Sequence, residues 1–289
     1  MRLFSVLTLT GLLTGASALS AAGPVDPEIA NQGTSLTFSG GWEAAPEGNF
    51  TLTREELAAI PGVKTVRETM IGQSEPADVT VLPLQDFLKA YPPLNPEAGL
   101  VLECLDKWES FLPPEFIEEH NPYLLLYYNG DPPGMGTWPM FGGDIEAMAP
   151  FYVYVSKFET PGFVYDTKYG MVSATQMSGI RLETEEERYA PFYAGKNGEL
   201  SEIAQTGRAL FLRRCNTCHQ GPGGVGGNVS ARPFQILQAH AKFNPGYFRS
   251  TVANPKAVFP ETIMPKHEDF GPAEFEALIA FLSQADPQP

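Results

Sequence analysis

The stretch Cys215-Asn216-Thr217-Cys218-His219 is the most informative part of this 289-residue sequence. Two thiols separated by two residues can face the same side of a helical turn and reach the two vinyl groups of a haem. The imidazole of the adjacent His219 then lies under the iron. The stretch therefore predicts one haem c, attached covalently through Cys215 and Cys218, with His219 as an axial ligand of the iron.

Two other uses of a Cys-x-x-Cys pair fit the sequence less well. A zinc finger or ribbon needs a second ligand pair at a set spacing, whereas the later histidines, His240 and His267, are isolated and far apart. A thioredoxin-type redox pair needs a strand–turn–helix frame, whereas a helix-like segment precedes this pair. A disulfide framework would pair its cysteines, but Cys104 brings the total to an odd number, three.

Met264 is the predicted second axial ligand because it is the only methionine after Cys218. Pro265 cannot continue a helix, so the thioether is presented from a stiff loop. A thioether with an imidazole is a common electron-transfer pair. His267, in the same loop, is the alternative ligand, and the reading of Met264 as an ordinary core residue stays open. His240 falls in a predicted helix, 231–242, and is expected at the surface or beside a haem propionate.

Two predicted helices enclose this region, Glu199–Phe211 before the cysteines and Pro272–Leu282 at the end. Gly207 would permit close approach of a partner helix. The apolar residues of the last helix follow the spacing i, i+3, i+4, i+7, namely Phe275, Leu278, Ile279 and Leu282. Residues 199–289 thus resemble a class I monohaem cytochrome c. That family has an N-terminal helix with a glycine and an aromatic residue, a C-x-x-C-H motif, a Met-Pro loop and a terminal helix, and all four features occur here in that order. The resemblance implies an all-α fold and one-electron transfer.

The segment between the cysteines and the Met264 loop offers further candidates. Residues 221–227 are rich in glycine but lack the Gly-Lys-Ser/Thr ending of a phosphate-binding loop, so we expect a loop of the haem crevice. Arg232 and Arg249 are candidates for contact with the haem propionates.

The charge of the chain is divided unevenly. The net charge is −15, of which residues 1–186 hold −16 and residues 187–289 hold +1. Such an acidic chain is not a general nucleic-acid binder, whose footprint would be basic. We predict an acidic domain at 23–186, a charged linker at 187–198 and the haem domain at 199–289. An acidic domain would dock or steer a redox partner with a positively charged surface.

Residues 1–22 have the layout of a secretory signal peptide. A basic residue, Arg2, precedes a short apolar run, and small residues follow. The run is shorter than the roughly 20 apolar residues that a membrane-spanning helix needs. We therefore expect an exported, periplasmic protein without a transmembrane anchor after signal cleavage.

The acidic half alternates strand and helix patterns. Thr53 and Glu56 form a capping-box pattern ahead of a helix that Pro61-Gly62 would end. The predicted strands are 50–53, 79–82, 100–104, 123–128, 151–155 and 173–182, with helices at 54–60 and 84–91. The fold class is α+β in two domains, a mixed β-rich N-terminal domain followed by the all-α domain.

Segments of this half resemble domains of the sulfite-oxidase (molybdopterin-binding) type. The similar segments are 52–63, 81–88, 102–108 and 171–182, and the likeness spans residues 48–183 loosely. The resemblance implies that Cys104, in a Cys-x-x-x-Trp segment, could bind molybdenum. The pterin carries phosphate, however, and residues 23–186 hold three arginines and five lysines without a cluster. We therefore expect a cofactor-free relative, with Cys104 buried as a small hydrophobic residue and Trp108 in the core.

The sequence therefore predicts an exported electron carrier with one covalent haem and an acidic docking domain, rather than an enzyme. Two alternatives stay open. One is a molybdenum-pterin oxidoreductase for a sulfite- or sulfoxide-type substrate that passes electrons to its own haem domain. The other is a structural haem subunit of a respiratory complex.

Overall fold

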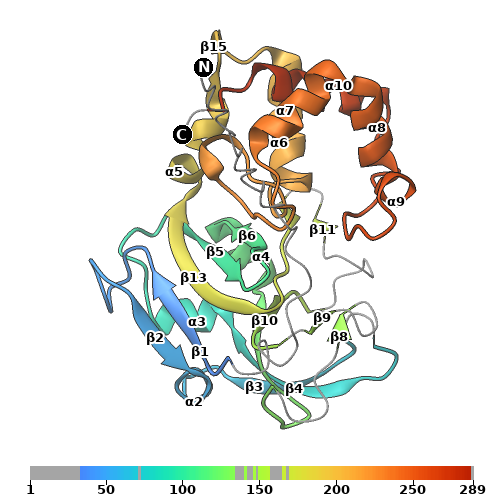
Figure 1. The fold of residues 1–289 in the computed structure, drawn as a ribbon. Helices are drawn as coiled ribbons and strands as arrows, with labels where there is room; N and C mark the ends of the chain where they lie inside the picture. Colours follow the sequence, from blue (N-terminus) through green and yellow to red (C-terminus); the bar gives the residue numbers. More distant parts are fainter. Residues whose placement is uncertain are drawn as a thin grey trace, which may run out of the picture.

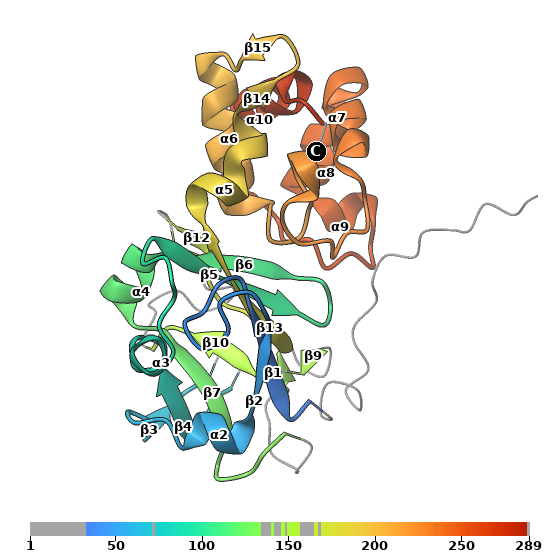
Figure 2. The same ribbon diagram turned by 90° about the vertical axis from the view of Figure 1, so that its left-hand side faces the viewer.

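The computed structural model describes residues 33–70, 73–133, 140–141, 146–147, 149–156, 165–166 and 169–287. The predicted signal peptide, 1–22, lies outside these residues. The described chain forms a β-rich part followed by a helical part, which lie one above the other in Figures 1 and 2. This arrangement confirms the predicted two-domain α+β layout.

A five-stranded sheet in the order β2-β1-β13-β5-β6 lies next to the helical part (Figure 1). Its strands are β1 (Ser35–Ser39), β2 (Phe50–Thr53), β5 (Ala98–Cys104), β6 (Glu109–Leu112) and β13 (Met177–Thr184). β1 and β13 pair in parallel, and the other neighbours pair antiparallel. The last long strand of the domain, β13, therefore occupies the middle of its sheet and leads directly into the helical part.

A four-stranded antiparallel sheet in the order β10-β7-β4-β3 makes the second layer. Its strands are β3 (Lys64–Glu68), β4 (Ala77–Pro83), β7 (Tyr123–Tyr128) and β10 (Tyr152–Tyr154). Short helices α2 (Arg54–Ala58), α3 (Leu84–Ala90) and α4 (Pro114–His120) and two-residue pairs β8–β9 (Met140–Phe141, Glu146–Ala147) and β11–β12 (Tyr165–Asp166, Gly170–Met171) complete this part.

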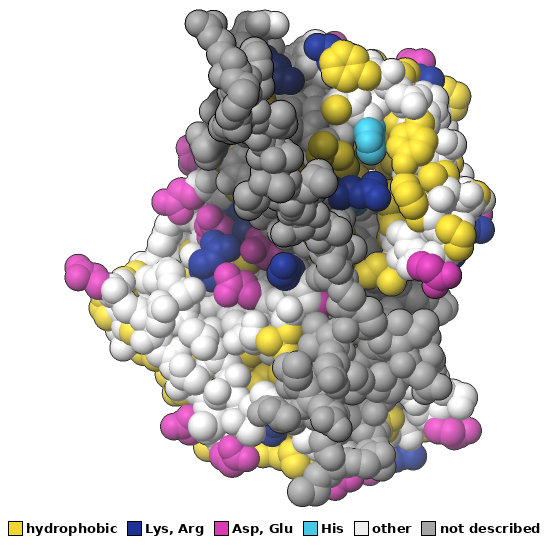
Figure 3. Space-filling view, viewed as in Figure 1, with side chains coloured by type: hydrophobic (Ala, Val, Ile, Leu, Met, Phe, Trp, Pro, Cys, Tyr) yellow, Lys and Arg dark blue, Asp and Glu magenta, His cyan; other side chains and the backbone are white. Residues whose placement is uncertain are grey.

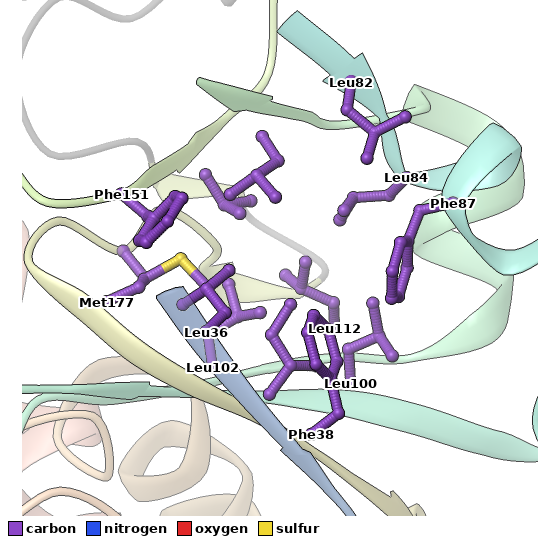
Figure 4. Packing of buried hydrophobic residues seen from close by; sticks show 14 of the residues in the cluster. Leu36, Phe38, Leu82, Leu84, Phe87, Leu100, Leu102, Leu112, Phe151 and Met177 are labelled. Carbon is purple, nitrogen blue, oxygen red and sulfur yellow. The ribbon is translucent and has the colours of Figure 1, made fainter. Parts of the chain in front are cut away.

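One hydrophobic core holds the β-rich part together. Side chains from both sheets and from the three helices meet in it, among them Phe38, Leu82, Phe87 and Leu102 (Figure 4). The alternation of strand side chains explains the arrangement in the first part of β7, before the register shift in its pairing with β4. Leu124 and Leu126 lie in this core, whereas Leu125 lies in a smaller cluster on the other face of the sheet.

The predicted capping box at the first helix is present. Thr53 Oγ1 accepts a hydrogen bond from the Glu56 main chain, and the Glu56 carboxylate accepts one from the Thr53 main chain. These bonds satisfy main-chain N–H groups that a helix start otherwise leaves without partners. They also hold the pKa of the exposed Glu56 carboxyl below its usual value. The helix lies before Pro61-Gly62 as predicted, but it ends at Ala58 rather than at the predicted residue 60.

The residues expected as a linker are folded. They contain the end of α5 (Glu185–Tyr189), the short 3-10 helix η1 (Ala190–Tyr193) and the two-residue pair β14–β15 (Ala194–Gly195, Gly198–Glu199). Arg188 is only 2% exposed, and Phe192 is fully buried in the core of the helical part. Segment 187–198 is therefore a packed connection, because burial of these two side chains outweighs the freedom that a solvated linker would keep.

The helical part consists of α6 (Glu202–Arg214), α7 (Phe234–Phe243), α8 (Pro245–Ala253), α9 (Pro255–Val258) and α10 (Pro272–Gln284), with a short 3-10 turn η2 (Pro222–Gly224). Helices α6 and α10 cross closely at Gly207, where an added Cβ would lie 1.9 Å from the Ala277 carbonyl oxygen. The predicted close approach at Gly207 is therefore confirmed. Phe211 and Phe281 pack beside the crossing, with ring centroids 5.6 Å apart.

None of the helices in the part of the chain that the structure describes combines the length and hydropathy needed to cross a membrane.

Candidate haem site

The two predicted haem-binding cysteines lie in a tight turn at the end of α6. The Cys215 amide donates to the Phe211 carbonyl at 2.9 Å, and the amides of Cys218 and His219 donate to the Cys215 carbonyl at 3.1 and 2.8 Å. These bonds continue the helical path through residue 219. Because residues three apart on such a path are neighbours, Cys215 and Cys218 occupy the same side of the turn. Their placement suits attachment to two substituents on one edge of a porphyrin.

His219 has the chemistry of a metal ligand. Its pKa is lowered to about 4, first by burial and then by the charges of Arg232 and His267. The imidazole is therefore neutral at physiological pH, which is the form that binds iron. Its Nδ1 atom is buried and makes no hydrogen bond within the described residues. An unsatisfied buried nitrogen is costly, and a role in a ligand site is one physical reason to retain it.

The thiol of Cys215 is held in its protonated form. Burial raises its pKa to about 12, and the nearby positive charge of Arg214 opposes this only in part. The side chain packs against the core of the helical part, beside residues such as Phe211. The site thus supplies an uncharged sulfur on an apolar wall, and such a wall suits the apolar face and edge of a porphyrin.

The glycine-rich loop predicted at the haem crevice wraps around the turn. The buried Asn216 side chain donates to the carbonyl of Val225 at 2.8 Å, and the Gly227 amide donates to the Asn216 carbonyl at 2.8 Å. Added Cβ atoms at Gly226 and Gly227 would lie 2.1 Å from the Asn216 Nδ2 atom and 1.7 Å from the Thr217 carbonyl oxygen. The glycines therefore serve close main-chain contact with the turn.

Both candidates for the second axial ligand lie in the loop before α10. Met264 is partly buried and packs against the core of the helical part. His267 is buried, stacks on Phe270 with ring centroids 4.8 Å apart, and lies near enough to His219 to lower its pKa. Burial, followed by the charge of Arg214, also lowers the pKa of His267 to about 4. The structure therefore brings this loop to the side of His219.

The other residues named from the sequence differ in position. Arg232 lies near His219, as its effect on the His219 pKa indicates, and its guanidinium lies 5.0 Å from the Phe259 ring centroid. Arg249 is exposed on α8 and lines a pocket of about 410 Å³ together with Phe270 and Phe275. His240 lies on α7 against the Tyr247 ring, with centroids 5.2 Å apart. Of these three residues, Arg232 is the one whose charge affects the pKa of His219.

Cys104 lies at the end of β5 and belongs to the core of the β-rich part, with 9% of its surface exposed. Trp108 is partly buried against the same core and donates from Nε1 to Ser110 Oγ at 2.7 Å. Across the described residues, no three side chains of His, Cys, Asp or Glu are grouped as a metal site requires. The Cys104 side chain thus lies in the hydrophobic core of the β-rich part.

The turn formed by residues 215–219 is called the haem turn below. Sequence reasoning missed the residues through which the β-rich part contacts this turn. The Glu109 amide donates to the Thr217 carbonyl at 3.2 Å, and the Asn228 amide donates to the Lys107 carbonyl at 2.9 Å. Main-chain bonds between segments about 110 positions apart leave no local pattern in a sequence.

The comparisons with known proteins agree with this geometry for the helical part. Residues 202–282 match a family model described as "Cytochrome C oxidase, cbb3-type, subunit III". No protein in the curated collection matches the chain. The fold, the Cys-x-x-Cys-His turn and this match support a C-terminal cytochrome c domain, which implies haem binding and suggests haem-based electron transfer. The sulfite-oxidase-like resemblance of the β-rich part receives no support from these comparisons.

The residues present fit a haem. A neutral buried imidazole, two sulfurs on one side of a turn, and a loop that carries a thioether and a second imidazole form a donor set suited to haem iron. Phe211 and Phe270 belong to the hydrophobic core against which Cys215 and Met264 pack. These are the residues that would hold the group.

Proposed function

We propose that this protein is an exported c-type cytochrome that carries single electrons through one haem. Cys215 and Cys218 would hold the porphyrin through thioether bonds, while His219 and Met264 would bind its iron from opposite faces. The bound haem would supply reversible one-electron exchange between ferric and ferrous iron. The observation that carries the proposal is the Cys-x-x-Cys-His turn at the end of a helix inside a cytochrome c domain.

The chain around the proposed haem supports this role because it fixes the haem-binding side chains and shields one side of the site from water. The turn at the end of α6 and the glycine-rich loop fix the positions of the two sulfurs and the imidazole. The apolar core of the helical part excludes water from one side of the site, and this favours a stable low-dielectric environment for electron exchange. No described residue needs to move a proton or bind a substrate for this function.

Replacement of Met264 by alanine tests the axial ligand. If the thioether binds the iron, the far-red absorption band of the oxidised protein is lost on Met264→Ala and is retained on His267→Ala. The physical reason is that only one of these side chains would donate sulfur to the iron. Absorption spectra of the oxidised and reduced proteins measure the result. A parent protein without the band, in which His267→Ala changes the haem spectrum and Met264→Ala does not, would assign the ligand to His267 and contradict this part of the proposal.

The acidic domain would serve partner docking. Six exposed glutamates lie on two neighbouring helices, Glu115, Glu118 and Glu119 on α4 and Glu185, Glu186 and Glu187 on α5. Burial, followed by the charge of Glu115, raises the pKa of Glu185, and the second cause places the two carboxylates near each other. A partner with a positive surface would gain association rate from this field. Binding that weakens with added salt and with Glu118→Gln and Glu186→Gln tests this role.

One alternative function keeps a specific observation in its favour. The hairpin that carries Cys104 and Trp108 is hydrogen-bonded to the haem turn, as a route between a molybdenum centre and a haem would require. Against it stand the apolar surroundings of Cys104 and the shortage of cations for a phosphate. Metal analysis of protein matured in a competent host distinguishes the two functions. One molybdenum per haem would identify the protein as an oxidoreductase rather than an electron carrier.

The matched family also suggests a second possible role, as a subunit of a larger complex. Its name refers to a subunit of an oxidase, and a haem domain of that kind would stay with its complex during purification. Isolation of a single chain from the native membrane and soluble fractions would favour the independent carrier. Stable co-purification with membrane proteins would favour the subunit.

A further inference from the structure

The β-rich domain contacts the haem turn through the tip of its β5–β6 hairpin. The Glu109 amide bonds the carbonyl of Thr217, and the Lys107 carbonyl accepts from the amide of Asn228. Thr217 lies between the two cysteines that would carry the haem. The domain is therefore attached by main-chain bonds to the segment that would hold the porphyrin edge.

The hairpin tip and the segments around Thr217 and Gly227 are in close main-chain contact. A Cβ at Gly227 would lie 1.7 Å from the Thr217 carbonyl oxygen and 3.0 Å from the Lys107 carbonyl oxygen. Lys107 itself adopts the left-handed region at φ 70°, which is uncommon for a residue with a side chain. The hairpin tip and the haem turn thus meet through main chains, at positions where side chains would push them apart.

A network of ion pairs lies directly behind this contact. The Glu109 carboxylate pairs with Arg188 and also with Arg181 at 3.6 Å. Glu183 pairs with Arg188 at 2.9 Å and with Arg181 at 2.6 Å, and Glu103 pairs with Arg181 at 3.0 Å. Figure 3 shows basic and acidic side chains gathered where the two parts meet. With its three glutamates and two arginines ionised, the network carries one net negative charge.

The part of the network around Arg188 is shielded from solvent, whereas the side chains of Arg181 and Glu103 are 30% and 41% exposed. Arg188 is 2% exposed, and its guanidinium lies 5.6 and 5.5 Å from the ring centroids of Phe111 and Tyr189. The side chains of Glu109 and Glu183 are 19% and 25% exposed. Charges in such surroundings are screened less than charges on the surface, so they act over longer distances.

A fixed negative charge near a haem favours the oxidised state. Ferric iron carries one more positive charge than ferrous iron, so a nearby carboxylate stabilises the ferric form and lowers the reduction potential. A nearby guanidinium has the opposite effect. The sign of a charge change therefore predicts the sign of the potential change.

We propose that Glu109 is a positioning residue through which the β-rich domain sets the reduction potential of the haem, an inference that rests on the proposed haem function. Its main-chain N–H holds the Thr217 carbonyl, and its carboxylate anchors the ion-pair network behind the turn. The β-rich domain is then part of the haem site as well as a docking module.

Redox titration of the full-length holoprotein tests the proposal. Glu109→Gln keeps the main-chain bond and removes one negative charge, so the reduction potential rises. Arg188→Gln and, as a milder change, Arg181→Gln remove a positive charge, so the potential falls. We expect each change to alter the ferric-to-ferrous equilibrium by about three- to tenfold, where tenfold corresponds to 59 mV for one electron. Glu55→Gln, which removes an exposed charge from α2, is the matched control and leaves the potential unchanged.

Loss of packing alone gives a different result. Loosening of the interface would admit water and move the potential in one direction in the Glu109 and arginine variants alike. That outcome, or a Glu109→Gln shift no larger than the Glu55→Gln shift, would overturn the proposal. Parent protein that binds no haem would instead refute the proposed function.

Amide hydrogen exchange supplies a measurement that does not depend on the haem spectrum. In the full chain, the amides of Glu109 and Asn228 should exchange as slowly as those of the central strands, since both are bonded across the interface. Rapid exchange at these two amides would show that the hairpin does not hold the turn in solution, and would contradict the proposal.

Discussion

Simultaneous replacement of Cys215 and Cys218 by alanine is expected to convert the haem from a covalently attached group to one that acidified organic solvent extracts completely. The two sulfurs lie on one side of the turn at the end of α6, and we propose no other bond between porphyrin and chain. The parent protein should keep its haem under the same treatment. Solvent extraction followed by haem staining of the denatured polypeptide measures the difference.

Cys104→Ala is the matched control for this experiment. Cys104 belongs to the core of the β-rich part, so its removal should leave the haem attached while it slightly weakens that core. Haem extracted from the parent protein, or haem retained by the double variant, would contradict covalent attachment through these two residues. Loss of the haem in Cys104→Ala alone would move the attachment to the other domain.

Gly207→Ala is expected to destabilise the helical part by about 3 kcal/mol, the upper part of the range for overpacked cores. The new Cβ would lie 1.9 Å from the Ala277 carbonyl oxygen and 2.9 Å from the Phe281 Cβ, so α6 and α10 must separate. Alanine favours an isolated helix over glycine by only about 1 kcal/mol, so the steric cost is the larger effect. Urea unfolding followed by the helical circular-dichroism signal measures the loss.

The neighbouring residue Thr206 provides the control for Gly207. It is exposed on the same helix, so Thr206→Ala should change the free energy of unfolding by less than about 0.5 kcal/mol. If Gly207→Ala proved as stable as Thr206→Ala, the close crossing of α6 and α10 would not exist in solution. Reduced haem incorporation in the Gly207 variant would accompany the loss of stability, because α6 ends at the haem turn.

Local patterns predicted much of the secondary structure. β2 and β7 have the predicted bounds, and α10 begins at the predicted Pro272. The capping box at Thr53 also follows from residues close in sequence. β13 is shorter at its start than predicted, because Gln176 adopts a left-handed conformation just before Met177 and the strand begins after it. Alternation alone does not reveal such a turn.

Local sequence patterns also predicted part of the candidate haem site. Cys215, Cys218 and His219 are adjacent in the chain, so their common side of a turn follows from local geometry. The position of His267 near His219 depends instead on how the loop before α10 folds back across the domain. The sequence alone could name both Met264 and His267 but could not place either of them relative to the imidazole.

The sequence by itself determined that this protein has a helical domain with a Cys-x-x-Cys-His turn and an acidic domain rich in strands, because these properties depend on composition and on residues a few positions apart. The tertiary structure decided that the two domains are joined at the haem turn. That union depends on main-chain bonds from Lys107 and Glu109 and on the buried Arg188. Contacts across so many residues arise only when the chain has folded, since they are set by packing rather than by local propensity.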